Sequence, residues 1–218
     1  MRSVIAFDMD GVLVDSRSSI NQSLNVTLSH FGFPEVDPDG SSLIGLPLRE
    51  MMKAATNNQM TDEQIKSATP IYRQVNDELG SKTTIVYPEM QLVLSKLALN
   101  YDLIVVTSKL QQSARELLSS LAIDKHFVGI FGPESDGSAE DKSQTLIRAE
   151  NVLQASTAHQ MKIIALVGDR ASDIKAARCA NIQSIGVKWG YGSDNELTTA
   201  DFLADNPKQL LEYFLQQQ

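Results

Sequence analysis

Carboxylates gather at two points of the sequence where an apolar run ends. Asp8 and Asp10 follow the first apolar run of the chain. Asp169 and Asp173 follow a later run and stand four residues apart, at the start of a predicted helix. A carboxylate beside a buried strand is unfavourable unless it is paired with a cation, bound to a metal or used in a reaction. Both pairs could therefore bind a hard cation or carry acid–base chemistry.

Each pair also has an ordinary structural interpretation. Asp10-Gly11 between two apolar runs is typical of a turn. A calcium-binding loop fits poorly there, because the apolar residues 12–14 would occupy its later ligand positions. Asp169 and Asp173 could simply cap a helix and complement its dipole. The spacing alone leaves both interpretations open for each pair.

Hydroxyl and amino groups stand at the ends of two further predicted elements. Thr107, Ser108 and Lys109 follow the apolar run at 103–106, where hydroxyls and backbone N–H groups can bind an oxyanion. The alternative is a hydroxyl that caps a helix. Lys142 precedes a predicted helix, where a single lysine is usually a solvated charge. Ligands of open α/β sheets bind beyond the carboxyl ends of the strands, so the joint placement indicates a metal and phosphate site.

The elements that would hold these residues alternate between strand and helix. Three apolar runs rich in β-branched residues end at Asp8, Thr107 and Gly168, which is typical of parallel strands buried on both faces. Segments with helical leucine spacing separate them. We therefore predict an α/β fold with a doubly wound, mostly parallel sheet.

One long stretch interrupts this alternation. It contains no convincing strand, and Thr61 begins a capping-box sequence for one of its helices. Pro70 is expected to kink or divide that helix. We predict an all-helical domain at 16–85, inserted into a core domain made of 1–15 and 86–218.

Composition narrows the class of protein. The chain has 218 residues with 19 Lys and Arg against 27 Asp and Glu, a formal net charge of −8, and 42% hydrophobic residues. This is ordinary globular composition, and the acidic balance argues against a general nucleic-acid binder. The single cysteine, Cys179, excludes an intrachain disulfide. No apolar run is long enough for a signal-peptide core or a membrane span, so we expect a cytoplasmic protein without membrane or nucleic-acid partners.

The sequence resembles the haloacid dehalogenase superfamily of phosphotransferases. Residues 7–16, which read Phe-Asp-Met-Asp-Gly-Val-Leu-Val-Asp-Ser, match its first motif. The other three motifs are matched, in order, by Thr107, by Lys142, and by Gly168-Asp169 with Asp173. The resemblance implies a Rossmann-like core, and the helical insertion resembles the type 1 cap of this superfamily.

Two further segments resemble the phosphoglycolate phosphatase-like branch. They are Ile44-Gly45-Leu46-Pro47-Leu48, and Trp189-Gly190-Tyr191-Gly192 with Glu196-Leu197 after it. Two positions depart from the usual pattern. Ser143 stands where many relatives have Pro, and Ala176 where many have Gly.

The resemblance implies a magnesium-dependent phosphatase acting on a small-molecule phosphomonoester. Asp8 would attack phosphorus and form an aspartyl-phosphate, while Asp10 would serve as general acid and then general base. The Asp8 carboxylate, the Asp10 backbone carbonyl and Asp169 would hold Mg²⁺. Asp173 would complete the surroundings of the metal, directly or through water.

The same resemblance implies the phosphate contacts. Thr107 and Lys142 would hold the transferring phosphoryl oxygens. Ser108 and Lys109 are further candidates for substrate binding, with Lys109 the alternative phosphate-binding cation. Arg49 is a candidate for binding a second acidic group of the substrate, against the interpretation that it is a surface arginine on a helix.

Two other functions remain open. A phosphomutase of the β-phosphoglucomutase type would use the same residues but retain the aspartyl-phosphate until the sugar phosphate rebinds. A non-catalytic phosphate-binding protein could share the fold, although Asp8, Asp10 and Asp169 are all present. Phosphoglycolate, nucleotides and sugar phosphates are all possible substrates, and the protein could be a monomer or a homodimer.

Overall fold

The computed structural model describes residues 2–36, 43–135, 141–156 and 161–217. The chain folds as two compact units. We call residues 1–14 with 86–218 the core unit, and residues 15–85 the helical unit. Among the described residues, no helix combines the length and apolar character that a bilayer-crossing segment needs.

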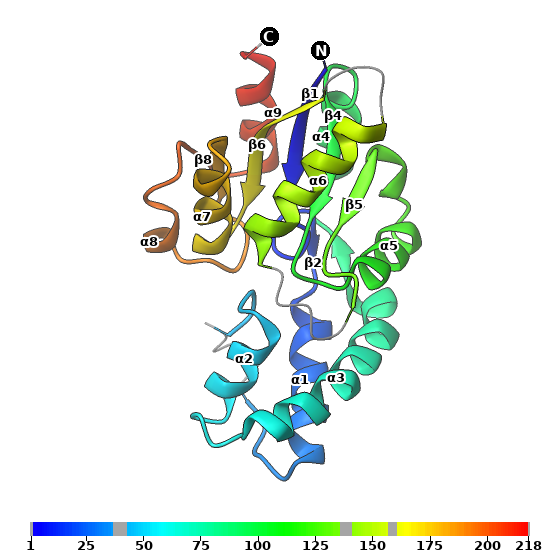
Figure 1. The fold of residues 1–218 in the computed structure, drawn as a ribbon, viewed down its shortest axis with the longest axis vertical. Coiled ribbons are helices and arrows are strands. Elements are labelled where there is room, and N and C mark those ends of the chain that lie inside the picture. The colour runs from blue at the N-terminus through cyan, green and yellow to red at the C-terminus, as the bar shows by residue number, and fades with distance from the viewer. Residues whose placement is uncertain (1, 37–42, 136–140, 157–160, 218) are drawn as a thin grey trace. The chain divides into compact units, whose positions relative to one another are not determined.

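A six-stranded parallel sheet forms the centre of the core unit (Figure 1). Its strands, in spatial order, are β5 (Gly129–Phe131), β4 (Asp102–Val106), β1 (Ser3–Phe7), β6 (Lys162–Gly168), β7 (Gln183–Val187) and β8 (Phe202–Ala204). The chain runs outward from β1 through β4 to β5, then returns to β6 beside β1 and runs outward in the other direction. The order therefore reverses between β1 and β6, which is where ligands bind in such sheets.

Helices cover both faces of this sheet. They are α4 (Met90–Leu97), α5 (Gln111–Ser120) and α9 (Pro207–Leu215) on one face, and α6 (Lys142–Ser156) and α7 (Ala171–Cys179) on the other. Side chains alternate along a strand, so Ile5 and Phe7 of β1 pack with the first group, and Val4 and Ala6 with the second. Burying a side chain such as Phe7 stabilises the fold by roughly 1.5–3 kcal/mol. The predicted α/β fold with a doubly wound parallel sheet is confirmed.

The described residues of the helical unit, 15–36 and 43–85, form the helices α1 (Arg17–His30), α2 (Leu48–Ala55) and α3 (Asp62–Thr83). The side chains of Thr61 and Gln64 form the capping box expected at the start of α3. The expectation that Pro70 could divide this helix is wrong, because α3 continues through it. Proline removes one backbone hydrogen bond, and the remaining turns of this long helix, packed against α1, sustain it. Two short strands, β2 (Val14–Asp15) and β3 (Ile85–Val86), pair where the chain leaves and re-enters the core unit.

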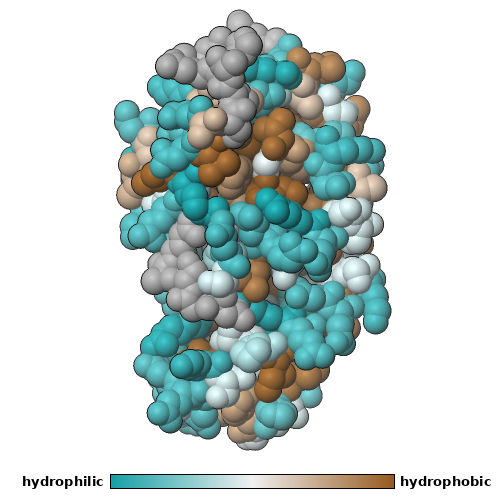
Figure 2. Space-filling model, turned by 45° about the vertical axis from the view of Figure 1, so that its right-hand side comes forward, coloured by the Kyte–Doolittle hydropathy of each residue, from teal (hydrophilic) through white to brown (hydrophobic). Residues whose placement is uncertain are grey.

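Most of the surface seen in Figure 2 is hydrophilic, with apolar residues in smaller patches. The large exposed apolar side chains include Val26 on α1, Leu92 on α4, and Leu99 and Val128 in connecting segments. Scattered residues of this kind are normal on a globular domain and mark no particular site. The chemistry-bearing residues instead lie at one end of the sheet.

Candidate active site

Three carboxylates meet at the carboxyl ends of β1 and β6. The backbone N–H of Asp8 donates to the Val167 carbonyl oxygen at 2.8 Å, which sets the end of β1 beside the end of β6. Asp169 directly follows β6, and Asp173 lies in the first turn of α7. Each of the three residues offers a carboxylate oxygen, and these oxygens all lie within 4.8 Å of one another. The side chains are buried, with Asp8, Asp169 and Asp173 only 7%, 0% and 1% exposed.

Lys142 supplies positive charge to this cluster from the start of α6. Its ammonium group lies 2.9 Å from an Asp8 oxygen and 2.5 Å from an Asp173 oxygen, and the side chain is 7% exposed. Lys142 brings one positive charge into contact with this cluster of described residues, so the three carboxylates carry an excess of negative charge when all of them are ionised. A bound divalent cation would balance that excess.

The pKa values in the cluster reflect this imbalance. Burial raises the pKa of Asp8 well above its ordinary value, with Asp173 and Asp169 adding to the effect and Lys142 opposing it. Burial and the Asp173 charge raise the pKa of Asp169 to about 7. Burial lowers the pKa of Lys142, but Asp173 and Asp8 outweigh it, and that pKa is raised. Lys142 therefore remains charged, while the aspartates favour a cation nearby.

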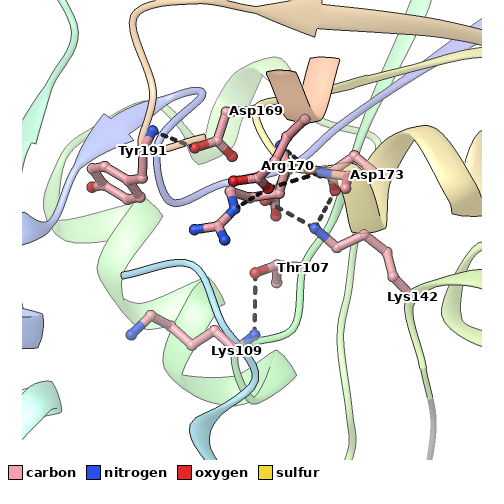
Figure 3. A network of polar contacts seen from close by, with 10 residues as sticks. Thr107, Lys109, Lys142, Asp169, Arg170, Asp173 and Tyr191 are labelled. Atoms are coloured by element: carbon pink, nitrogen blue, oxygen red, sulfur yellow. Dashed lines mark hydrogen bonds and ion pairs between the residues drawn. The ribbon is translucent and has the colours of Figure 1, made fainter. Parts of the chain in front are cut away.

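The hydrogen bonds distinguish Asp169 from Asp173 (Figure 3). The Tyr191 N–H donates to Oδ2 of Asp169 at 2.6 Å. Oδ1 of Asp169 is buried and accepts no hydrogen bond within the described part of the chain. Both oxygens of Asp173 are engaged, Oδ1 by Lys142 and Oδ2 by the Arg170 N–H at 2.9 Å. An oxygen without a donor among carboxylates fits a metal ligand, and it belongs to Asp169.

The first motif forms the turn that its sequence suggests. The Gly11 N–H donates to the Val14 carbonyl oxygen, and Gly11 has a φ of +83°. A Cβ at this position would lie 2.2 Å from Oδ2 of Asp169, so glycine is required by contact as well as by conformation. Asp10 is half-buried in this turn, and its carboxylate is not a member of the three-carboxylate cluster. The turn and the functional interpretation of these residues are therefore compatible.

Thr107 stands at the end of β4, the neighbour of β1. Its N–H donates to the Phe131 carbonyl oxygen at 3.0 Å, and its hydroxyl oxygen accepts from the Lys109 N–H at 3.2 Å. Thr107 is buried, Ser108 is exposed and Lys109 is half-buried. Figure 3 shows Thr107 at the same end of the sheet as Lys142, and the Lys109 side chain extending away from Lys142. Thr107 thus adds a hydroxyl in a fixed position at the carboxyl end of β4, beside the ends of β1 and β6.

Arg49 belongs to α2 of the helical unit. Its guanidinium lies 2.8 Å from Asp62, and Lys53 lies 3.0 Å from the same carboxylate. Hydrogen bonds from Arg49 and Lys53 lower the pKa of Asp62. The Arg49 side chain is 55% exposed, so this is a surface ion pair of small energetic value. The structure gives Arg49 a partner within its own unit, and a role in substrate selection stays a prediction.

Two contacts around the cluster were not predicted from the sequence. The Tyr191 N–H reaches Asp169 from the segment after β7, and Glu196 reaches Arg170, with its Oε2 2.9 Å from the Arg170 Nε. Both lie in the stretch that resembles phosphoglycolate phosphatase-like sequences, but the resemblance assigned them no role. A backbone donor leaves no signature in residue types, so only the structure could identify the Tyr191 contact.

Comparison with known proteins gives the family. A family model for haloacid dehalogenase-like hydrolases matches residues 5–187, and the chain belongs to this family. A tyrosine-protein kinase, PtkA of Mycobacterium tuberculosis, is 30% identical over 191 residues, which cover 87% of this chain and 63% of that protein. The chain therefore spans less than two thirds of the length of that relative.

Other relatives match over nearly their whole length. A phosphoglycolate phosphatase of Chromobacterium violaceum is 29% identical over 218 residues, covering 95% of this chain and 94% of that protein. The structure of a predicted phosphatase from Clostridium acetobutylicum superimposes with a TM-score of 0.88 at 26% identity, covering 99% of both chains. The resemblance noted in the sequence is thereby confirmed.

Proposed function

We propose that the protein is a magnesium-dependent phosphatase that hydrolyses a small-molecule phosphomonoester through an aspartyl-phosphate on Asp8. The observation that carries this proposal is the buried cluster of Asp8, Asp169 and Asp173 around Lys142, at the point where the strand order reverses. The similarity to a phosphoglycolate phosphatase over most of both chains supports the same reaction class. A cytoplasmic location, and a monomer or homodimer, stay predictions.

The proposed reaction has two displacements at phosphorus. In the first, an Asp8 oxygen attacks the phosphorus atom, the bond to the ester oxygen breaks, and Asp10 gives a proton to the leaving alkoxide. In the second, water attacks the phosphorus of the aspartyl-phosphate while Asp10 takes its proton. The bond to Asp8 then breaks, which releases inorganic phosphate and restores both carboxyl groups to their starting states.

The other candidate residues would position the nucleophile and the substrate, and would neutralise charge on the phosphoryl oxygens. Lys142 touches the Asp8 carboxylate at 2.9 Å, so it can fix the nucleophile and stay close to the phosphoryl oxygens. The hydroxyl of Thr107 would donate to one of those oxygens, and Ser108 and Lys109 would contact the substrate beside it. Arg49, in the helical unit, is the proposed contact for a second acidic group. We propose that this unit acts as a cap that selects the leaving group.

Three groups would hold Mg²⁺, namely the carboxylates of Asp8 and Asp169 and the backbone carbonyl of Asp10. When bound, the ion supplies positive charge that neutralises the phosphoryl oxygens. The unpartnered Oδ1 of Asp169 supports this assignment. Both oxygens of Asp173 already accept hydrogen bonds, so Asp173 would act through water and through Lys142.

The experiment is phosphate release from a broad panel of phosphate esters, measured with Mg²⁺ and with EDTA. We expect turnover that EDTA abolishes and that Asp8→Asn lowers by at least about a thousandfold, since the amide is a poor nucleophile. Asp205→Asn, which removes an exposed carboxylate paired with Lys188 in the same unit, is the matched control and should retain activity.

Other outcomes would assign a different function. Isomer formation from a sugar phosphate without net phosphate release would replace the phosphatase by the phosphomutase. If the protein neither releases phosphate nor becomes labelled at Asp8 by acetyl phosphate, the remaining function is that of a phosphate-binding protein. Full activity of Asp8→Asn would contradict the proposed nucleophile.

A further inference from the structure

The segment after β7 packs its backbone directly against Asp169. The Tyr191 N–H donates to Oδ2 of Asp169 at 2.6 Å. A Cβ at Gly190 would lie 2.5 Å from that same oxygen, and a Cβ at Gly192 would lie 1.9 Å from the Asp169 carbonyl oxygen. No side chain fits at either glycine without displacing the loop. The position of residues 189–192, the Trp189–Gly192 loop, therefore determines where the Asp169 carboxylate can point.

Contacts on both sides fix this loop in place. On one side, the indole N–H of Trp189 donates to the Val12 carbonyl oxygen at 3.1 Å. On the other side, Glu196 of the short helix α8 (Asp194–Leu197) binds the start of α7. Its Oε2 accepts from the Arg170 Nε at 2.9 Å and from the Ala171 N–H at 3.4 Å. Glu196 thus joins the end of the loop to the residues that directly follow Asp169.

The Arg170–Glu196 ion pair is partly shielded from solvent, so it can hold the two segments together more strongly than an exposed pair. The Arg170 and Glu196 side chains are only 11% and 30% exposed. Burial raises the pKa of Glu196, but the Ala171 N–H and the Arg170 charge outweigh it, so the pKa is lowered and the carboxylate stays ionised at neutral pH. The oxygen Oε1 also accepts from the Ser193 N–H at 3.4 Å, within the same segment. A charged group with several donors fixes a loop more firmly than a neutral one.

We propose that Glu196 is a positioning residue for the metal-binding carboxylate of Asp169, acting through the Trp189–Gly192 loop. The inference rests on the proposed function, because it assumes that Asp169 binds Mg²⁺. With the loop fixed, the Tyr191 N–H holds Oδ2 and leaves Oδ1 of Asp169 directed at the cation. Without Glu196, the loop and its N–H donor can move, and Asp169 loses its fixed orientation.

The test is the affinity for Mg²⁺, measured on the protein without substrate. Trp189 is the single tryptophan of the chain, so intrinsic fluorescence reports on this loop. We expect Glu196→Ala to raise the Mg²⁺ concentration at half-saturation about tenfold, the usual scale for a lost contact behind a metal ligand. This weaker Mg²⁺ binding should appear both in the titration followed by Trp189 fluorescence and in the Mg²⁺-induced rise of the thermal unfolding midpoint. At saturating Mg²⁺, kcat should return close to the wild-type value.

Two variants accompany the measurement. Glu196→Gln keeps an oxygen that can accept from Arg170 and Ala171, so its half-saturation should lie between those of wild type and Glu196→Ala. Glu212→Ala removes an exposed carboxylate that lies 3.8 Å from Lys208 on α9, and it should match wild type. If Glu196→Ala does not fold, Glu196→Gln decides the question by the same titration.

The outcomes separate this inference from the proposed function. A lower unfolding midpoint with an unchanged Mg²⁺ half-saturation would show that Glu196 is only structural, which overturns the inference. A wild-type half-saturation in Glu196→Gln, when Glu196→Ala does not fold, would overturn it as well. If wild type itself neither binds Mg²⁺ nor releases phosphate, the proposed function falls, and the inference falls with it.

Discussion

At the scale of single residues, Asp169 is the most informative side chain of the core unit. It is fully buried, one of its oxygens accepts from Tyr191, and the other accepts nothing among the described residues. A buried carboxylate with an unsatisfied oxygen lowers the stability of a metal-free protein. The buried carboxylate of Asp169 therefore stabilises the protein only when a ligand binds to its oxygen Oδ1.

The burial of the Asp169 charge predicts an unusual effect of Asp169→Asn. In EDTA at pH 8 we expect the variant to unfold at a higher temperature than wild type, because the substitution removes a buried charge that repels Asp8 and Asp173. The amide oxygen can still accept from the Tyr191 N–H. With Mg²⁺ added, wild type should be stabilised and the variant should not.

Thermal unfolding with and without Mg²⁺ checks both statements. A variant that is less stable than wild type in EDTA would show that the negative charge of Asp169 is compensated within the protein. A variant that Mg²⁺ stabilises as strongly as wild type would show that Asp169 does not bind the metal.

At the scale of elements, the order of the strands assembles the site. The pairing β4-β1-β6 places Thr107, Asp8 and Asp169 at the ends of three adjacent parallel strands. The start of α6 and the first turn of α7 then add Lys142 and Asp173. The sequence predicted the strands from their apolar, β-branched runs, but the runs carry no information about which strand pairs with which. The prediction that the candidate residues lie close together rested instead on the general rule that ligands bind at the carboxyl ends of parallel strands.

Some elements could not be predicted because their stability comes from contacts with the rest of the core. Strand β8 has only three residues and pairs with β7, and α8 has four. Neither is long enough to show a hydrophobic period. Asp201, just before β8, secures this edge, because its carboxylate accepts from both the N–H and the hydroxyl of the buried Ser184.

The Asp201 contact predicts a pH dependence of stability. Hydrogen bonds from Ser184 lower the pKa of Asp201, so its contribution is present above the ordinary carboxyl pKa near 4 and is lost as the pH falls through the lower, folded value. We expect Asp201→Asn to reduce the free energy of unfolding by about 1 kcal/mol at pH 7, because the group is exposed and its bonds are partly screened.

Urea unfolding at pH 7 and at pH 3 measures this contribution. The difference between wild type and Asp201→Asn should shrink at pH 3, while Asp194→Asn, an exposed substitution on α8, should match wild type at pH 7. A difference that is equal at both pH values would contradict the assigned role of the charge.

At the scale of the whole molecule, two compact units divide the chain, and the chemistry assembled above belongs to the core unit. The candidates Asp8, Lys142, Asp169 and Asp173 were chosen from the sequence because of their joint placement around the predicted strand ends and their match to the haloacid dehalogenase motifs. The type and position of Lys142 alone carried no such information. Asp10 follows β1 and Thr107 follows β4, at the same edge of the sheet. The catalytic and binding roles of all these residues stay proposals. Arg49 could not be judged from the sequence, since its partner Asp62 is 13 positions away in the chain on another helix.

Covalent phosphorylation of Asp8 is the step on which the proposed mechanism depends, and chemical trapping can detect it. The protein would be mixed with Mg²⁺ and acetyl phosphate, or with the best ester of the panel, and quenched with borohydride, which reduces an acyl phosphate to an alcohol. We expect peptide mass spectrometry to find the reduced side chain at position 8 of wild type, and no reduced side chain there in Asp8→Asn. Reduction at another carboxylate, or none at all while phosphate release continues, would contradict the proposed mechanism.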